Sequence, residues 1–184
     1  MRKIAFLGLP LVLVLILFFT ILGAVGPEWG KVHSQARMKT AVLGKVSKEQ
    51  SARRFEYLFP RLTQRFREAF SQDERFEVTP AEELDRAVAK TGIQEGNLNP
   101  DDPAQLRKIG QEAGADLIFV SYYYEMGGHG MPMHSNNVLT LVWVNQDKTV
   151  KINRDYSRIL SETELTSSDE MALKELMKKA ESMF

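Results

Sequence analysis

Asp102-Pro-Ala-Gln-Leu-Arg-Lys-Ile-Gly-Gln-Glu-Ala-Gly-Ala-Asp-Leu-Ile-Phe-Val120 is the stretch of the chain that decides the predicted fold. Asp102 before Pro103 is typical of a helix start, because the carboxylate accepts from free amides and the proline has no amide to leave unpaired. Gly114 predicts the end of this helix. The apolar residues 117–120 follow at once. The stretch therefore predicts a helix that leads through a tight turn into a buried strand.

Upstream of this stretch, the sequence predicts a strand and then a long helix. Residues 39–46 are typical of a short strand. Ser47 and Gln50 have the spacing of a capping box, which indicates a helix start. Phenylalanine and leucine then recur at three- and four-residue steps, so the helix has one apolar face. We expect Pro60 to kink or split this helix, because proline removes a backbone donor and crowds the preceding turn.

A second strand and a second helix start follow. Residues 76–78 predict a brief strand, and the sequence Thr-Pro-Ala-Glu at 79–82 predicts the beginning of a helix. In this pattern Thr79 is the capping residue and Pro80 the first helical residue. Gly92 predicts the end of this helix.

Downstream, the sequence predicts three more strands and a closing helix. Residues 116–124 form a strong strand, and a glycine-rich loop is expected over residues 126–135. Residues 138–144 are apolar on both faces, as in a central strand. Residues 149–160 alternate more and are typical of a strand near an edge. Ser167 is expected to cap a final amphipathic helix.

This order of elements predicts the α/β class, with a mixed sheet of about five strands and helices packed on it. We expect residues 38–184 to form this one domain, which is long enough for a core without disulfides. Residues 1–29 are expected to form an N-terminal membrane anchor. Residues 30–37 are then the linker.

Three segments carry a resemblance to a known family: residues 40–43 before a long helix, residues 75–79 before the next, and the stretch 102–120. They resemble the amino-terminal domain of TolB-type periplasmic proteins and the related fold of CsgG, a curli-secretion protein, and LpoB, a penicillin-binding-protein activator. The chain departs from the pattern at residues 121–123, where the family often has a glycine. The resemblance covers roughly residues 38–183. It implies an assembly or interaction module of the bacterial envelope, and it brings no catalytic residues.

A predominantly apolar run without a charged residue, at residues 4–26, follows Arg2 and Lys3. As a helix it would span roughly 34 Å, enough to cross a hydrocarbon core about 30 Å thick. The two basic residues predict a cytoplasmic N-terminus and export of the rest of the chain. An uncleaved anchor is favoured over a cleaved signal, because the run is longer than a signal's apolar region and Pro27 disfavours cleavage. Without cysteine, we do not expect a lipoprotein.

Composition excludes several classes of function. The chain has 24 basic and 24 acidic side chains, so no basic field exists to bind nucleic acid. The absence of cysteine excludes disulfides and thiolate chemistry. The sequence contains no phosphate-binding loop, nucleophile elbow or zinc-type spacing. We therefore expect no enzyme, and a hydrolase is the weakest of the functions considered.

Two groups of polar residues are interpreted as structural. The carboxylate pairs Glu82-Glu83, Asp101-Asp102 and Asp169-Glu170 each lie at a predicted helix start, where they complement the helix dipole and the free amides. Tyr122 and Tyr124 share one face of their strand and Tyr123 the other. A core position for these tyrosines is favoured over an exposed contact patch.

Only the predicted loop at residues 126–135 suggests metal chemistry. His129, Met131, Met133 and His134 combine imidazole and thioether groups, which are ligand types that favour copper, above all the reduced ion. The alternative is a hairpin tip whose methionines touch a partner or the membrane surface, since methionine is an adaptable contact residue. The second interpretation is favoured.

The sequence therefore predicts a non-catalytic accessory or structural subunit of a bacterial envelope complex, without a cofactor. We expect a single-pass protein of the inner membrane with its C-terminal domain in the periplasm. Its expected partners are the lipid bilayer and membrane proteins of that complex, contacted by both the membrane helix and the exported domain. The alternative is a copper-binding or copper-delivery module that uses the loop from His129 to His134.

Overall fold

The computed structural model of the chain describes residues 36–47, 55–93, 98–128 and 131–183. The chain divides into two units, residues 1–35 and 36–184, and the described residues all belong to the second. The predicted anchor, residues 1–29, lies outside the described residues and stays a prediction. Within the four described ranges, no helix is both long enough and apolar enough to cross a bilayer.

In the described residues, five strands form one mixed sheet in the order β2-β1-β3-β4-β5. Their bounds are β1 Met38–Ser47, β2 Phe76–Val78, β3 Leu117–Gly128, β4 Met131–Trp143 and β5 Thr149–Tyr156. β1 runs parallel to β2 and β3, whereas β3, β4 and β5 pair antiparallel. The predicted mixed α/β sheet is confirmed, and so are the internal place of β4 and the edge position of β5.

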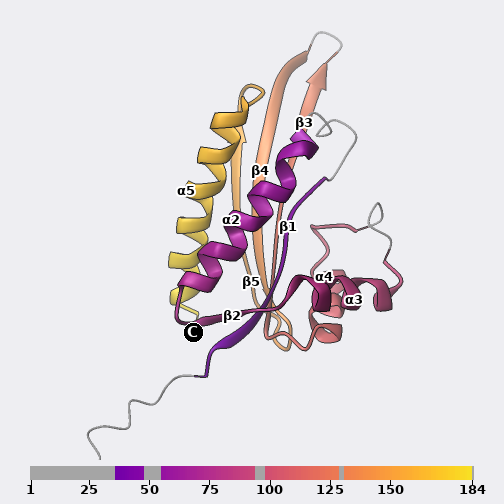
Figure 1. The fold of residues 1–184 in the computed structure, drawn as a ribbon. Coiled ribbons are helices and arrows are strands. Elements are labelled where there is room, and N and C mark those ends of the chain that lie inside the picture. The colour runs from indigo at the N-terminus through magenta and orange to yellow at the C-terminus, as the bar shows by residue number, and fades with distance from the viewer. Residues whose placement is uncertain (1–35, 48–54, 94–97, 129–130, 184) are drawn as a thin grey trace, which may run out of the picture. The chain divides into compact units, whose positions relative to one another are not determined.

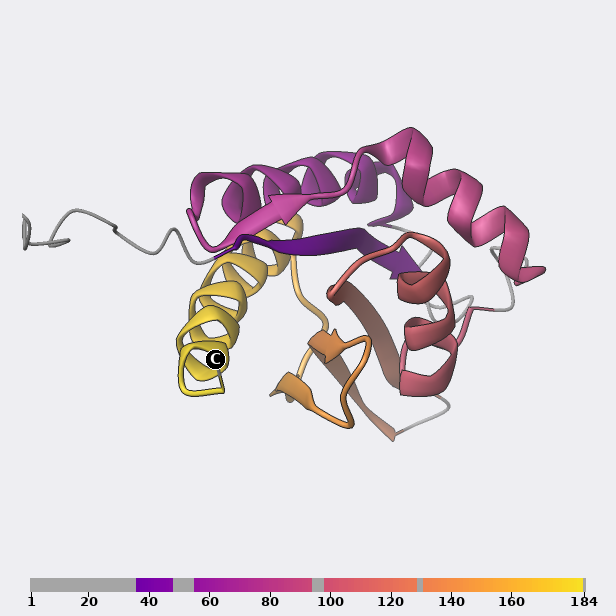
Figure 2. The ribbon, with the colours of Figure 1, turned by 90° about the horizontal axis from the view of Figure 1, so that it is seen from below.

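The helices of the described part cover the two faces of this sheet in pairs (Figure 1, Figure 2). α2 (Phe59–Gln72) and α5 (Glu162–Glu181) lie side by side on one face, and α3 (Ala81–Thr91) and α4 (Pro103–Glu112) lie on the other. The face under α2 and α5 holds the larger, aromatic-rich core, which includes Phe66, Phe70, Phe119, Leu141 and Leu176. The face under α3 and α4 holds a smaller aliphatic core, which includes Leu84, Leu106, Ile109, Ile118 and Val142.

Helix starts were predicted with mixed success. Asp102 caps α4 as predicted, because its side chain accepts from the amides of Ala104 and Gln105. Residues 55–58 form a 3-10 turn and α2 begins at Phe59, so the predicted helix is split close to Pro60, which lies in the first turn of α2 and does not kink it. The first turn of a helix leaves its amides free, and there proline opens a helix instead of breaking it. Ser47 is the last residue of β1, and the helix predicted to start there begins at Phe59.

Two predicted caps are wrong. α3 starts after Pro80, so Thr79 does not cap it. The Thr79 amide still donates to the Thr40 carbonyl of β1, which keeps Thr79 in the strand pairing. The Thr79 hydroxyl has no hydrogen-bond partner among the described residues. α5 starts about a turn and a half earlier than predicted, at a capping box formed by Ser161 and Glu164. This earlier start brings the fully buried Leu165 into the helix, so packing favours it.

The predicted loop at residues 126–135 is mostly strand. β3 continues to Gly128 and β4 begins at Met131, with Met126 paired to His134. Antiparallel pairing needs only backbone groups, so it can continue where the side chains no longer show an apolar pattern. The β3–β4 hairpin consequently extends past the ends of α2 and α5 (Figure 1).

Candidate functional site: a groove above a buried polar cluster

A shift in strand register brings a lysine into the core. Val42 pairs with Phe119 and Gly44 with Val120, so Leu43 has no partner on β3. One extra residue reverses the alternation of side chains beyond it. Lys45 therefore lies on the same face as Val42, beneath α2 and α5.

Gly44 is the residue that permits this shift. Its φ is +83°, a left-handed conformation that other residues adopt only with strain. A Cβ at this position would lie 2.2 Å from Oγ1 of Thr63 on α2. That hydroxyl accepts a hydrogen bond from the Lys45 amide at 3.0 Å. The close approach of α2 to β1 thus requires glycine for both conformation and space.

Five side chains make up what we call the buried polar cluster: Lys45, Ser121, Asn137, Ser168 and Asp169. The Lys45 ammonium donates to Asp169 Oδ1 at 2.7 Å, to Asn137 Oδ1 at 2.5 Å and to Ser121 Oγ at 3.1 Å. Asn137 Nδ2 donates to Ser168 Oγ at 2.8 Å and to Asp169 Oδ1 at 2.9 Å. The cluster joins β1, β3, β4 and α5.

Lys45 has a structural role within this cluster. An ammonium has three N–H donors, and the three contacts above use them all. Its side chain is 0% exposed, so no substrate can reach the nitrogen. Burial lowers the pKa of Lys45 below its ordinary value, and the neighbouring Asp169 opposes this shift by charge attraction and hydrogen bonding. The amine is therefore not placed to act as a nucleophile or base.

The two oxygens of Asp169 have different surroundings. Oδ1 accepts from Lys45 and Asn137, whereas Oδ2 is buried and has no hydrogen-bond partner among the described residues. The Asp169 side chain is only 2% exposed. A buried acceptor without a donor costs about 1–3 kcal/mol. This oxygen is thus ready to accept a hydrogen bond from something outside the cluster.

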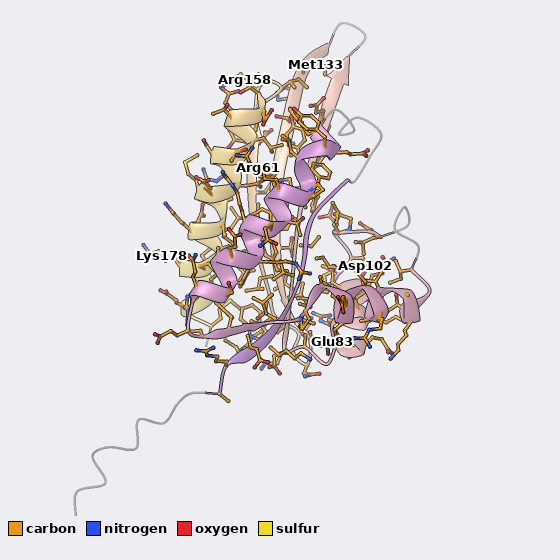
Figure 3. All side chains as sticks on the ribbon, viewed as in Figure 1. Arg61, Glu83, Asp102, Met133, Arg158 and Lys178 are labelled. Atoms are coloured by element: carbon orange, nitrogen blue, oxygen red, sulfur yellow. The ribbon has the colours of Figure 1, made fainter. Side chains whose placement is uncertain are left out.

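A groove of about 310 Å³ runs between α2 and α5, and Asp169 is one of its lining residues. The two helices, marked by Arg61 on α2 and Lys178 on α5, lie side by side in Figure 3. The apolar residues of the groove are Leu62, Phe66, Ala69 and Leu173, and its charged residues besides Asp169 are Arg65, Glu68, Glu170 and Lys174. The lining therefore combines apolar side chains with the buried Asp169 and with two basic and two acidic side chains.

An ion pair links the two sides of this groove. Arg65 Nη1 on α2 lies 2.7 Å from Glu170 Oε1 on α5. Their side chains are 39% and 59% exposed, so the pair is solvated and contributes little to stability. A side chain entering the groove can displace it at little cost.

The structure corrects the interpretation of the carboxylate pairs. Glu82 and Glu83 lie in the first turn of α3, as predicted. Asp169 was predicted to lie at a helix start and instead lies inside α5, buried against Lys45. Sequence reasoning also missed Lys45 itself. The available signal was a lysine after glycine inside an otherwise apolar strand.

The tyrosines lie mainly in the core, as favoured by the sequence. Tyr122 and Tyr123 are 1% and 0% exposed, and Tyr124 is half-buried and stacks on Tyr122 at 6.0 Å. The Tyr122 hydroxyl donates to Asp101. Burial, and then this hydrogen bond, raises the pKa of Tyr122 well above its ordinary value. Asp101 also accepts from Lys151 at 2.5 Å, on the sheet face opposite to the buried polar cluster.

The predicted copper ligands are only partly described. His129 lies outside the described residues, and Met131 is the first residue of β4. Met133 is 40% exposed and His134 half-buried. As successive residues of a strand, these two point to opposite faces. Among the described side chains, no group of three or more histidines and carboxylates could hold a metal ion.

No protein-family model matches the sequence, and no curated protein matches it. Solved structures with a partly similar fold include the C-terminal domain of LpoB from Salmonella enterica, with a TM-score of 0.43 and 12% identity over 65% of this chain and 82% of that one. The same domain from Escherichia coli has a TM-score of 0.42 and 13% identity over 66% and 83%. Lipoprotein GNA1162 from Neisseria meningitidis has a TM-score of 0.36 and 13% identity over 79% and 99%. These likenesses are partial and assign no family or function to the chain.

Proposed function

We propose that this chain is a non-catalytic accessory or structural subunit of a membrane complex in the bacterial envelope. Residues 4–26 anchor it in the inner membrane with the N-terminus in the cytoplasm, and the α/β domain lies in the periplasm. The domain acts as a protein-interaction module. Its partners are membrane proteins of the same complex.

The observation that carries this proposal is the exposed β3–β4 hairpin. Met126 is 48% exposed and Met133 is 40% exposed, on a hairpin that extends past the helices (Figure 1). Figure 3 places Met133 close to its tip. His134 pairs with Met126 and shares its face, so the adjacent Met133 points to the other side. Methionine is enriched in protein interfaces because its flexible thioether adapts to irregular surfaces.

The buried polar cluster supports the non-catalytic part of the proposal. Lys45 is the one buried basic side chain of the described residues. It is enclosed and uses its three donors on neighbouring side chains. An acid–base or nucleophilic role needs a group that can reach a substrate, which Lys45 cannot do.

Site-specific cross-linking in native membranes tests the interaction role. We would replace Met126 or Met133 by a photoreactive phenylalanine in the full-length chain, with the exposed Ala89 on α3 as the control position. The expected result is a discrete adduct with an envelope protein from the two hairpin positions and none from Ala89. Equal, diffuse labelling from all three positions would contradict the proposal.

Deletion of residues 1–26 tests the anchor. The full chain is expected to purify in mild detergent with its membrane partners, and the shortened chain is expected to lose them. Intact-mass measurement of the mature chain distinguishes an uncleaved anchor from a cleaved signal. A mature chain that begins after residue 26 would overturn the anchored form of the proposal.

Copper binding is the second candidate, and one observation favours it. The strand register makes Met126 and His134 cross-strand neighbours, which brings a thioether and an imidazole together on one face. Titration of the purified chain with copper, with His129→Ala and His134→Ala as variants, tests this function. Absence of variant-sensitive binding tighter than micromolar would exclude it.

A further inference from the structure

We propose that the groove between α2 and α5 receives a tyrosine or tryptophan side chain of a protein partner, whose O–H or N–H donates to Oδ2 of Asp169. Two features support this proposal, and Asp169 is itself a lining residue of the groove. Leu62, Phe66, Ala69 and Leu173 give it apolar walls. Asp169 Oδ2 supplies a buried acceptor that no donor among the described residues satisfies.

The acceptor identifies the kind of group that binds. Buried polar atoms in folded proteins have hydrogen-bond partners in the great majority of cases, so an unsatisfied one calls for an explanation. Oδ1 of the same carboxylate already accepts from Lys45 and Asn137. An oxygen of a carboxylate can only accept, and Asp169 forms an ion pair with Lys45 at 2.7 Å. The missing group is therefore a donor.

Charge argues against a lysine or arginine as that donor. Lys45 already balances the charge of Asp169, so a second buried cation would leave a net positive charge away from water. The rim does not favour a cation either, because it carries two basic and two acidic side chains, Arg65 and Lys174 against Glu68 and Glu170. A neutral donor satisfies Oδ2 without this penalty.

Shape and polarity then point to an aromatic side chain with a polar end. Tyrosine and tryptophan have a large apolar body and a single terminal donor, and buried examples nearly always find a hydrogen-bond partner. The groove offers about 310 Å³, with Phe66 among its walls and Asp169 as its buried acceptor. Tyrosine and tryptophan are also the residues that most often dominate the energy of protein interfaces.

The inference rests on the proposed interaction role for one point only, that the side chain comes from a protein. The groove and the hairpin are separate surfaces, so each can fail its test alone. Loss of hairpin cross-links would leave the groove measurement unaffected. Absence of groove binding would likewise leave the hairpin adducts in place.

The test measures side-chain analogues binding to the full-length chain in detergent micelles by ligand-observed saturation-transfer NMR. The probes are N-acetyl-tyrosinamide and N-acetyl-tryptophanamide, with N-acetyl-phenylalaninamide as the analogue without a donor and N-acetyl-argininamide as the cation. Empty micelles give the background. We expect the tyrosine analogue to bind about tenfold more tightly than the phenylalanine analogue, as for a hydrogen bond to a charged acceptor.

A groove-filling variant locates the binding. Ala69→Leu adds a side chain to the groove from α2, an element that contributes no residue to the buried polar cluster, and Ala89→Leu on the exposed surface of α3 is the matched control. Ala69→Leu should weaken binding at least about tenfold, and Ala89→Leu should leave it unchanged. Asp169→Asn is less informative, because loss of the charge leaves Lys45 unpaired and can unfold the chain.

Three results would overturn the inference. The first is equal binding of the phenylalanine and tyrosine analogues, which would exclude the hydrogen bond. The second is binding that Ala69→Leu does not weaken, or no binding above empty micelles. The third is tighter binding of the arginine analogue, which would indicate a cation site instead.

Discussion

Two lysine–aspartate pairs lie on opposite faces of the same sheet. Lys45 and Asp169 meet at 2.7 Å beneath α2 and α5, with side chains 0% and 2% exposed. Lys151 and Asp101 meet at 2.5 Å on the other face, with side chains 45% and 27% exposed. The contacts are nearly the same in chemistry and length, but only one of them is shielded from water.

Burial decides what each pair does. In the exposed pair, the contact between the two ions replaces contacts with water, so the pair stabilises the folded state by only about 0–1 kcal/mol. The buried pair also contributes little net stability, because both ions lose their hydration on folding. Removing one partner, however, leaves an uncompensated charge in the core. The buried pair therefore constrains how β1, β3, β4 and α5 can pack, whereas the exposed pair is replaceable.

The largest expected effect is that of Lys45→Met. It leaves Asp169 charged and unpaired in the core, so we expect a loss of about 3–5 kcal/mol in the free energy of unfolding. Urea unfolding of the purified chain, followed by circular dichroism, measures this. The double variant Lys45→Met/Asp169→Leu should recover a large part of the loss. If Lys45→Met is as stable as the parent chain, burial does not make the loss of a partner more costly in this pair than in the exposed one.

Gly44→Ala should have the next largest effect. The Cβ would require a left-handed conformation at φ +83° and would overlap the Thr63 side chain. We expect a loss of about 2–4 kcal/mol from strain and overpacking together. Gly92→Ala is the matched control, since its φ is +71° with nothing within 4 Å, and it should cost only about 1–2 kcal/mol. Equal losses in the two variants would mean that the approach of α2 is not tight.

Lys151→Met is the counterpart of Lys45→Met on the other face. Because Lys151 is half-exposed, its loss should change the free energy of unfolding by no more than about 1 kcal/mol. The same urea experiment measures both variants. A loss as large as that of Lys45→Met would remove the distinction between the two faces.

The smallest effect concerns a third ion pair, that of Glu164 with Arg158 at the start of α5. Hydrogen bonds from Arg158 and Ser161 lower the pKa of Glu164 from 4.5 to about 2. A carboxyl with a lowered pKa stabilises the folded state above pH 4.5 and loses that contribution as the pH falls toward 2.

Glu164→Gln keeps a side chain able to cap the helix but removes this titration. Thermal unfolding between pH 4.5 and 2 should therefore depend less on pH in the variant than in the parent chain. The difference should be small, because the group is exposed and solvent screens it. An unchanged slope would show that Glu164 has no such role.

Much of the fold could be predicted from local signals. β2 at Phe76–Val78 and the cap of α4 at Asp102 were predicted at the observed residues, because short-range sterics and hydrogen bonds determine them. The start of α5 was misplaced, because two capping boxes compete and only core packing selects the one at Ser161. The ends of β3 and β4 were missed, since backbone pairing continues without an apolar pattern.

The candidate site could not be predicted in the same way. Lys45 and Asp169 are 124 residues apart, and each has an ordinary local interpretation, as a strand lysine and as a residue of a helix start. Only the register shift beside Leu43 turns Lys45 inward. Only the early start of α5 brings Asp169 opposite to it.

The sequence by itself determined the class of fold, the order of most elements and the expectation of an exported, anchored domain, because these follow from periodicity, capping and apolar length. The tertiary structure alone decided which charges are buried and where a groove opens. Burial depends on which faces pack together, and a one-residue shift in a strand changes that for every side chain beyond it. The buried polar cluster beneath the groove therefore depends on one glycine in β1, whose role becomes visible only in the pairing of β1 with β3.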